Sequence, residues 1–185
     1  RSIDGQRLIE NGVVEDFKRE DNGLFGGLKF KDLLEEETEY MLILLVTTDK
    51  EEQLHYYSKI FICENEYIAE SIDFVLDFHK KTFDKEQAAI LTKYLESNSG
   101  ADNSNFNYVN IHSSFDQVTW GNMQVQEEIS ETLTISEING EITGYQLNFV
   151  VSNTEEDVTN FYRVNEYYRV RHTATRMYLL DYERS

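Results

Sequence analysis

Proline is absent from the 185-residue sequence, and cysteine occurs once, at Cys63. A single cysteine excludes an intramolecular disulfide and any zinc site built from several cysteines. Long apolar runs are also missing, because the longest, Met41 to Val46, falls far short of the roughly 20 residues of a membrane-spanning helix. The chain must therefore be held by its core, to which 12 Tyr, 11 Phe and 1 Trp contribute. This length and aromatic content predict one domain over residues 1–185.

Basic residues are scarce, since 17 Lys and Arg stand against 35 Asp and Glu, a formal net charge of −18. Affinity for nucleic acid comes largely from Lys and Arg that displace counterions, so we expect no binding to DNA or RNA and none to anionic lipid. The segment from Tyr94 to Tyr162 contains eleven acidic residues and no Lys or Arg. The charge favours a protein partner with a basic surface patch.

The first half of the chain predicts short antiparallel strands. Asp21-Asn22-Gly23 is a turn signal between two short extended segments. Met41 to Val46 is apolar at every position, which predicts a strand covered on both faces. Further strands are expected at Leu54 to Cys63 and Tyr67 to Leu76. The short turns between these runs favour an antiparallel meander.

One amphipathic helix is predicted from about Asp84 to Ser97. Asp84 can accept hydrogen bonds from the first backbone N–H groups, and Gln87 three residues later completes a capping-box pattern. The apolar residues from Ile90 to Leu95 fall on one stripe, with charged residues on the opposite side. The predicted fold class is therefore α+β, a mainly antiparallel β-sheet of meander and hairpins with this helix packed on it.

The second half predicts a hairpin of two long strands, Gln124 to Ser136 and Tyr145 to Val151. Apolar residues alternate with polar ones in the first of them, which leaves one face of the sheet in water. We expect a three-residue loop that ends at a left-handed Gly140, because that register places Leu133 opposite Tyr145 on one apolar face.

Two acidic residues of this hairpin, Glu127 and Glu131, fall among the apolar positions. A β-bulge near Glu127-Glu128 would reset the phase and return both side chains to water. Alternatively, the face is open there and the two carboxylates project from an apolar patch. Deep burial without a partner is the least favourable arrangement, because an unpaired buried charge is costly.

Two more strands are predicted near the C-terminus, Phe161 to Val170 and Thr173 to Tyr182. One face of the first strand combines aromatic and arginine side chains, a composition typical of interfaces. Five arginines follow the acidic stretch: Arg163, Arg169, Arg171, Arg176 and Arg184. Either they pair internally with the acidic strands, or part of the acidic sheet stays open to a basic partner.

Catalytic signatures are missing from this sequence. None of the four histidines belongs to a metal-binding or nucleophile motif. Glu127 and Glu131 resemble a glycosidase pair only in residue type, and so acidic a chain produces such pairs by chance. Cys63 lies in an apolar strand and is expected to be a small buried side chain. We therefore expect no enzyme activity, no cofactor and no metal site.

Four stretches carry a family resemblance: Asn11-Gly12-Val13-Val14-Glu15-Asp16-Phe17, Gly27-Leu28-Lys29-Phe30, the aromatic stretch Tyr56 to Phe74, and the acidic hairpin Gln124 to Val151. Together they resemble the TipC-type immunity proteins of Gram-positive bacteria, which are small, acidic and β-rich. The similarity is one of pattern and spans most of the chain. It implies a non-enzymatic protein that neutralises a cognate secreted toxin outside the cytoplasm.

The resemblance also implies an N-terminal segment that anchors or exports the protein. The chain begins at Arg1 and not at Met, which is compatible with the removal of such a segment. We therefore expect an extracytoplasmic location, with a cytoplasmic one as the alternative.

The predicted function is that of an immunity or inhibitor protein that binds its toxin through an acidic, aromatic sheet surface. The predicted partner-binding residues are Glu127, Glu131, Glu155, Glu156, Asp157, Tyr162 and Tyr167. Aromatic anchors would supply affinity, and the acids would supply steering and selectivity. The alternative is an acidic DNA-mimic antagonist, which needs carboxylates spaced like phosphates. The Ser, Thr and Gln side chains of Gln124 to Ser136 argue against it, and the oligomeric state stays open.

Overall fold

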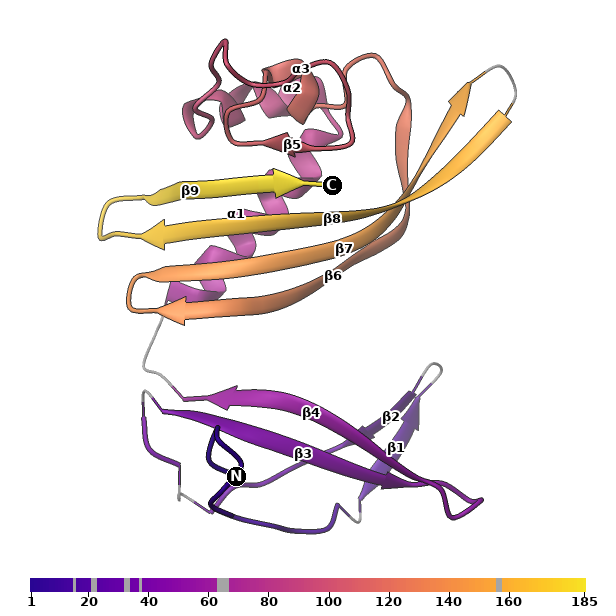
Figure 1. Ribbon diagram of the computed structural model, residues 1–185, viewed down its shortest axis with the longest axis vertical. Coiled ribbons are helices and arrows are strands. Elements are labelled where there is room, and N and C mark those ends of the chain that lie inside the picture. Colours follow the sequence, from indigo (N-terminus) through magenta and orange to yellow (C-terminus); the bar gives the residue numbers. More distant parts are fainter. Residues whose placement is uncertain (15, 21–22, 32–33, 37, 63–66, 156–157) are drawn as a thin grey trace. The chain divides into compact units, whose positions relative to one another are not determined.

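The computed structural model describes residues 1–14, 16–20, 23–31, 34–36, 38–62, 67–155 and 158–185. The chain forms two compact units, Arg1–Asn65 and Glu66–Ser185 (Figure 1). Our expectation of one domain over residues 1–185 stays a prediction.

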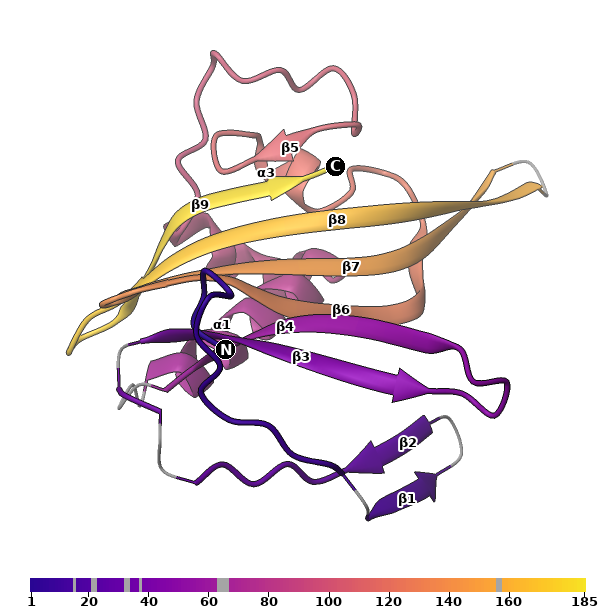
Figure 2. The ribbon, with the colours of Figure 1, turned by 60° about the horizontal axis from the view of Figure 1, so that its bottom comes forward.

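The N-terminal unit contains two antiparallel hairpins. In the first, β1 (Phe17–Glu20) pairs with β2 (Gly23–Gly26), and in the second, β3 (Glu39–Thr47) pairs with β4 (Gln53–Phe61). The turn predicted at 21–23 falls between β1 and β2, although residues 21 and 22 lie outside the described part of the chain. The N-terminus lies beside β3, where the Met41 N–H donates to the Arg1 carbonyl oxygen at 2.9 Å (Figure 2).

The apolar strand β3 is less covered than its sequence predicts. Apart from one bridge between Ser2 and Tyr40, it pairs with β4 alone among the described residues. Leu45 is 54% exposed, and Leu44 and Val46 are exposed as well. Our prediction of a strand covered on both faces is wrong here, because an apolar run does not by itself supply a layer for each face.

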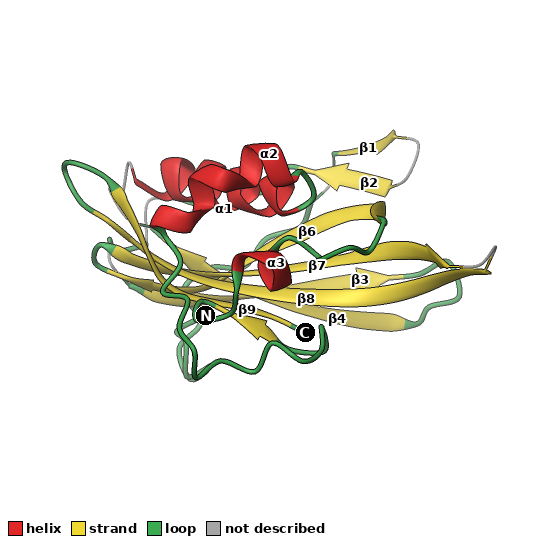
Figure 3. Cartoon of the chain, turned by 90° about the horizontal axis from the view of Figure 1, so that it is seen from above, coloured by secondary structure: helices red, strands yellow, loops and turns green. Residues whose placement is uncertain are grey.

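The C-terminal unit is built on a five-stranded antiparallel sheet in the order β5-β9-β8-β7-β6. Its strands are β5 (Val109–Asn110), β6 (Val125–Asn139), β7 (Ile142–Glu155), β8 (Val158–His172) and β9 (Met177–Arg184). In Figure 3, α1 and α2 lie along one face of this sheet. The two strands predicted near the C-terminus are therefore confirmed, and the mainly antiparallel α+β class is confirmed with them.

The segment predicted as a third meander strand is instead the longest helix, α1 (Tyr67–Thr82). Its buried side chains are Ser71, Val75, Phe78, His79 and Thr82, a spacing of three and four residues that follows a helical stripe. The prediction failed because apolar residues in 67–76 also alternate in part, so a short window fits both periods. The helix packs its Phe78 ring against Tyr168 and Tyr182 in the sheet, with ring centroids 5.6 and 5.3 Å away.

The predicted helix at 84–97 is shorter than expected. It consists of α2 (Lys85–Ala88) and a 3-10 turn, η1 (Ala89–Lys93). Asp84 caps it as predicted, because its carboxylate accepts from the backbone N–H groups of Glu86 and Gln87. The helix does not continue to Ser97, because the Glu96 backbone N–H donates to the Ile111 carbonyl oxygen, outside the helix, at 2.9 Å. With α3 (Phe115–Val118), the described residues hold three α-helices, so the expectation of one amphipathic helix is wrong.

The β6–β7 hairpin has the predicted strands but another register. Asn139 pairs with Ile142, so the loop has two residues and the predicted three-residue loop is wrong. Gly140 is left-handed with φ of 56°, as predicted. Leu133 faces Leu147 in place of Tyr145, because the loop has two residues and an irregularity between Ile135 and Glu137 shifts the pairing before Leu133.

Candidate functional site

The C-terminal unit buries a carboxylate that the sequence did not single out. Glu166, in the middle of β8, is fully buried on the face that α1 covers. Its Oε2 accepts from His79 Nδ1 at 2.7 Å and from the Tyr168 hydroxyl at 2.8 Å. Its Oε1 accepts from the Tyr182 hydroxyl at 3.0 Å. These partners come from α1, β8 and β9, so the carboxylate joins the helix to two strands.

The electrostatics of this cluster favour an ionised Glu166. Burial opposes its charge, yet the hydrogen bond and charge of His79 and the positive charge of Arg184 lower the pKa of the carboxyl. Burial likewise opposes a charged His79, but the hydrogen bond and charge of Glu166 raise the pKa of the imidazole. Burial, and then the nearby charge of Glu166, raise the pKa of Tyr168 well above its ordinary value. The Tyr168 and Tyr182 hydroxyls therefore keep their protons and donate them in hydrogen bonds to the Glu166 carboxylate.

Arg184, the cross-strand partner of Glu166, is 1% exposed and held by the C-terminal end of α3. Its Nη1 donates to the Val118 carbonyl at 2.9 Å, and its Nη2 donates to the Gln117 carbonyl at 2.6 Å. Its guanidinium lies 3.5 Å from the centre of the Trp120 ring. Two backbone carbonyls and a ring face thus compensate the buried positive charge, although Arg184 Nε has no hydrogen-bond partner among the described residues, and the charge adds a favourable field at Glu166.

The two anomalous acids of β6 lie beside this buried cluster. The predicted bulge is present, because the register shifts between Glu127 and Ile129. Both acids nevertheless lie near the buried His79: Glu127 Oε1 is 3.5 Å from His79 Nε2, and Glu131 joins the same group of ligand-type atoms. The Glu127 side chain is 28% exposed. Our bulge prediction is confirmed, and Glu127 is exposed as expected, but Glu131 is half-buried, so only one of the two acids returns to water.

A second feature of this unit is the end of β8 that extends past β9. The pairing of β8 with β9 runs from His172 to Glu166, and Asn165 exchanges two backbone hydrogen bonds with Ser185, each 2.9 Å long. Beyond that point, the segment Val158–Val164 pairs with β7 on one side only (Figure 1). We call this segment the β8 arm.

The β8 arm has an open strand edge. Backbone groups of successive residues in a strand point to alternate sides, so those of Arg163, Phe161 and Thr159 point to the side that Asn165 uses to pair with Ser185. Within the described part of the C-terminal unit, no strand pairs with that side. The arm also exposes large apolar side chains, since Phe161 is 64% and Tyr162 is 51% exposed.

The predicted partner-binding residues do not form one surface. Tyr162 pairs with Val151 on the face that carries α1, and Val151 pairs in turn with Glu127. Tyr167 lies on the opposite face, next to Gln146. Glu155 ends β7 and accepts from Asn153 Nδ2 at 2.9 Å.

The other two predicted acids, Glu156 and Asp157, lie outside the described residues. The role of the predicted set in partner binding stays a prediction.

The C-terminal arginines are only partly engaged with the acidic strands. Arg169 Nε lies 3.3 Å from Glu137 Oε2, and it reaches across the side-chain-free Gly144 between them. Arg176 stacks on the ring of Tyr178, with 3.9 Å between the guanidinium and the ring centre. Within the residues that the structure covers, no guanidinium pairs with Glu127 or Glu131. Among the described residues, these arginines therefore neutralise the acidic strands locally, at the Arg169–Glu137 pair.

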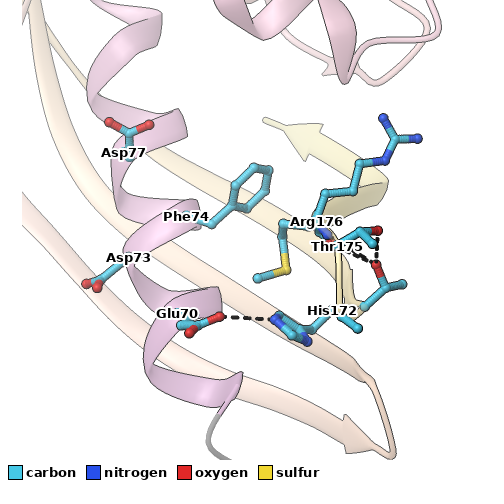
Figure 4. A pocket seen from close by; sticks show the side chains of 10 residues that line it. Glu70, Asp73, Phe74, Asp77, His172, Thr175 and Arg176 are labelled. Carbon is cyan, nitrogen blue, oxygen red and sulfur yellow. Dashed lines mark hydrogen bonds and ion pairs between the residues drawn. The ribbon is translucent and has the colours of Figure 1, made fainter.

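The C-terminal unit also has an open depression of about 460 Å³ between α1 and the turn after β8. At its rim, His172 Nε2 lies 3.0 Å from Glu70 Oε2, and the ring of Tyr67 stacks on the imidazole. In Figure 4, Glu70 points to His172, whereas Asp73 points away from it. The carboxylates that line the depression do not converge on one point.

Sequence reasoning missed the buried cluster because its members are far apart in the chain. His79 and Glu166 are separated by 87 positions, and neither lies in a motif. The one signal in the sequence was an acid at an even position of β8, among Val164, Tyr168 and Val170, which all face the core. An acid on an apolar face needs a partner when it is buried, so Glu166 called for a histidine or a set of hydroxyls.

No helix in the described ranges is long and apolar enough to cross a membrane. Comparison with protein-family models, with curated proteins and with solved structures finds no match to this chain. Its function therefore has to follow from the buried cluster and the β8 arm.

Proposed function

We propose that this protein is a non-enzymatic immunity or inhibitor protein that binds and neutralises a cognate protein toxin. The observation that supports the proposal best is the open edge of the β8 arm, together with the exposed Phe161 and Tyr162 rings on it. Unpaired strand edges with apolar side chains favour pairing with another chain, and soluble proteins usually protect them. An edge left open in this form is therefore a docking site.

The mode of binding that suits this edge is strand addition. A segment of the partner lies alongside residues 158–164, and main-chain hydrogen bonds to Phe161 and Arg163 supply general affinity. Aromatic side chains on both faces of the arm act as anchors in pockets of the partner. The net charge of −18 attracts a basic partner over a distance and raises the association rate.

The resemblance to TipC-type immunity proteins supports a secreted bacterial toxin as the partner and an extracytoplasmic location. Both remain part of the proposal. The open edge by itself supports a macromolecular partner, and the resemblance supplies its identity.

The test uses the toxin encoded beside the gene of this protein, co-expressed with it in a sensitive host. Wild-type protein protects the cells and binds the purified toxin. Arg163→Pro removes an edge N–H that no strand of this unit uses, and proline is tolerated on such an edge, so the fold survives while strand addition is blocked. Phe161→Ala removes an anchor. The matched control is Ile90→Ala, which truncates a side chain of similar exposure, 51%, in η1.

We expect Arg163→Pro and Phe161→Ala to abolish or strongly weaken binding, and Ile90→Ala to bind as the wild type does. The association rate of the wild type should fall as ionic strength rises. Wild-type affinity in Arg163→Pro would show that the edge is not used. Failure of the wild type to protect against the neighbouring gene's product would overturn the assignment as its immunity protein.

A further inference from the structure

Three ligand-type side chains converge between α1 and the edge strand β6. One atom each from His79, Glu127 and Glu131 lies within 4.8 Å of the other two. The His79 side chain is fully buried, and its Nε2 makes no hydrogen bond to any described residue. The nearest carboxylate atom, Glu127 Oε1, is 3.5 Å away, which is beyond a normal N–H···O bond. A buried ring nitrogen is thus aimed at two acids without a bond to either.

The hydrogen bond behind the ring decides what this nitrogen offers. Ionised Glu166 can only accept, so the proton in its bond to His79 lies on Nδ1. In the neutral ring, Nε2 then presents a lone pair toward Glu127 and Glu131, whose oxygens are acceptors as well. Three acceptors that face one another repel unless a proton on Nε2 or a metal cation lies among them.

We propose that His79, Glu127 and Glu131 bind a divalent transition-metal ion of the Zn²⁺ or Mn²⁺ type. Imidazole suits Zn²⁺ and carboxylates suit Mn²⁺, whereas Mg²⁺ and Ca²⁺ favour oxygen ligands alone. Bonds of about 2.0–2.2 Å place two ligands of a tetrahedral ion about 3.3–3.6 Å apart. The observed 3.5 Å between His79 Nε2 and Glu127 Oε1 is close to that spacing. Small rotamer changes of the two glutamates complete the arrangement.

The buried cluster supports the site from behind. Histidines that bind metal usually donate their other N–H to a carboxylate, which sets the tautomer and increases the basicity of the ligating nitrogen. Glu166 holds this position, and the Tyr168 and Tyr182 hydroxyls hold Glu166 in turn. Support of a metal-binding His79 gives a reason for burying the Glu166 carboxylate, which takes part in no surface ion pair among the described residues.

The ion would join α1 to the irregular part of β6 and leave at least one coordination position for water, because only three protein ligands are present. Glu127 is partly exposed, so solvent reaches this position. The site uses none of the backbone groups of the β8 edge. It goes beyond the proposed function, and the failure of either leaves the other standing.

The experiment titrates the full chain, freed of metal with a chelator, with Zn²⁺, Mn²⁺ and Mg²⁺ in a calorimeter. We expect one saturable Zn²⁺ or Mn²⁺ site and no binding of Mg²⁺. Glu127→Gln and Glu131→Gln should each weaken binding by about tenfold or more. Glu128→Gln is the matched control, because that neighbouring carboxylate accepts from Ser152 Oγ and should not affect the affinity.

Two further readouts distinguish this site from zinc binding elsewhere on the chain. His172→Gln removes the exposed pair with Glu70, the competing place for a zinc ion, and the tight site should survive it. In nitrogen NMR spectra, Zn²⁺ should shift His79 Nε2, and it should raise the melting temperature of the wild type but not of Glu131→Gln. The proposal is overturned if the glutamine variants bind as the wild type does, or if Nε2 carries a proton that Zn²⁺ does not displace.

Discussion

Replacing Glu166 with glutamine tests how much the buried cluster stabilises the C-terminal unit. The carboxylate is fully buried and accepts from His79, Tyr168 and Tyr182. Glutamine has nearly the same shape, but its NH₂ group must face at least one of these donors, and its neutral amide no longer balances the buried Arg184. Removing one partner of a buried charge pair costs about 3–5 kcal/mol. We expect a loss of about 3 kcal/mol in the free energy of unfolding.

The assay is urea unfolding followed by the fluorescence of Trp120, the one tryptophan of the chain, which is buried in the same unit. Tyr182→Phe removes a single hydrogen bond to the charged group and should cost about 1.5–3 kcal/mol. Asp73→Asn, at an exposed carboxylate of α1, should change stability by less than about 0.5 kcal/mol. A loss below about 1 kcal/mol in Glu166→Gln would refute the reasoning, since a charge whose removal costs so little is not held by these partners.

Two further predictions concern a turn and a helix cap. Gly140→Ala should lower the free energy of unfolding by about 1–2 kcal/mol, because φ at this position is 56°. No atom lies within 4 Å of an added Cβ, so backbone strain accounts for the whole loss. Urea unfolding measures the loss, and an unchanged midpoint of unfolding would contradict the prediction. Hydrogen bonds from Gln87 lower the pKa of the Asp84 carboxyl, so carbon NMR should show it titrating below 3.8. The stability that this cap contributes is therefore complete above pH 3.8, and it is lost as the pH falls through the lower pKa of the folded protein. Gln87→Ala should move that midpoint upward, and an unmoved midpoint would show that the Gln87 side chain contributes nothing.

Strands and turns were the parts of the fold that local pattern predicted well. Alternation of apolar residues indicated β6, and Gly140 marked its turn. The failures came where two periods fit one segment, as in 67–76, where a helix forms because its stripe packs on Tyr145 and Tyr168. The register of β6 was also beyond local pattern, since it is set by irregularities at three points along the pairing with β7.

The candidate sites show the same division. The anomaly at Glu127 and Glu131 was visible as two acids on an apolar face, but nothing near them in the chain named His79 as the third member. The β8 arm was predicted as a strand with Tyr and Phe on it. How far its edge is paired depends on the pairing with β7 and β9, which only the folded sheet shows.

The amino-acid sequence alone determined the strong negative charge, the strand-rich class, the cap at Asp84 and the turn at Gly140, because each depends on composition or on neighbours a few positions apart. Tertiary structure alone decided that His79 meets Glu166 across 87 positions and that β8 outruns its neighbour. Contacts of that kind form only when folding brings distant segments together. The entropic cost of closing the chain and the free energy gained from the contact cannot be read from a few neighbouring residues.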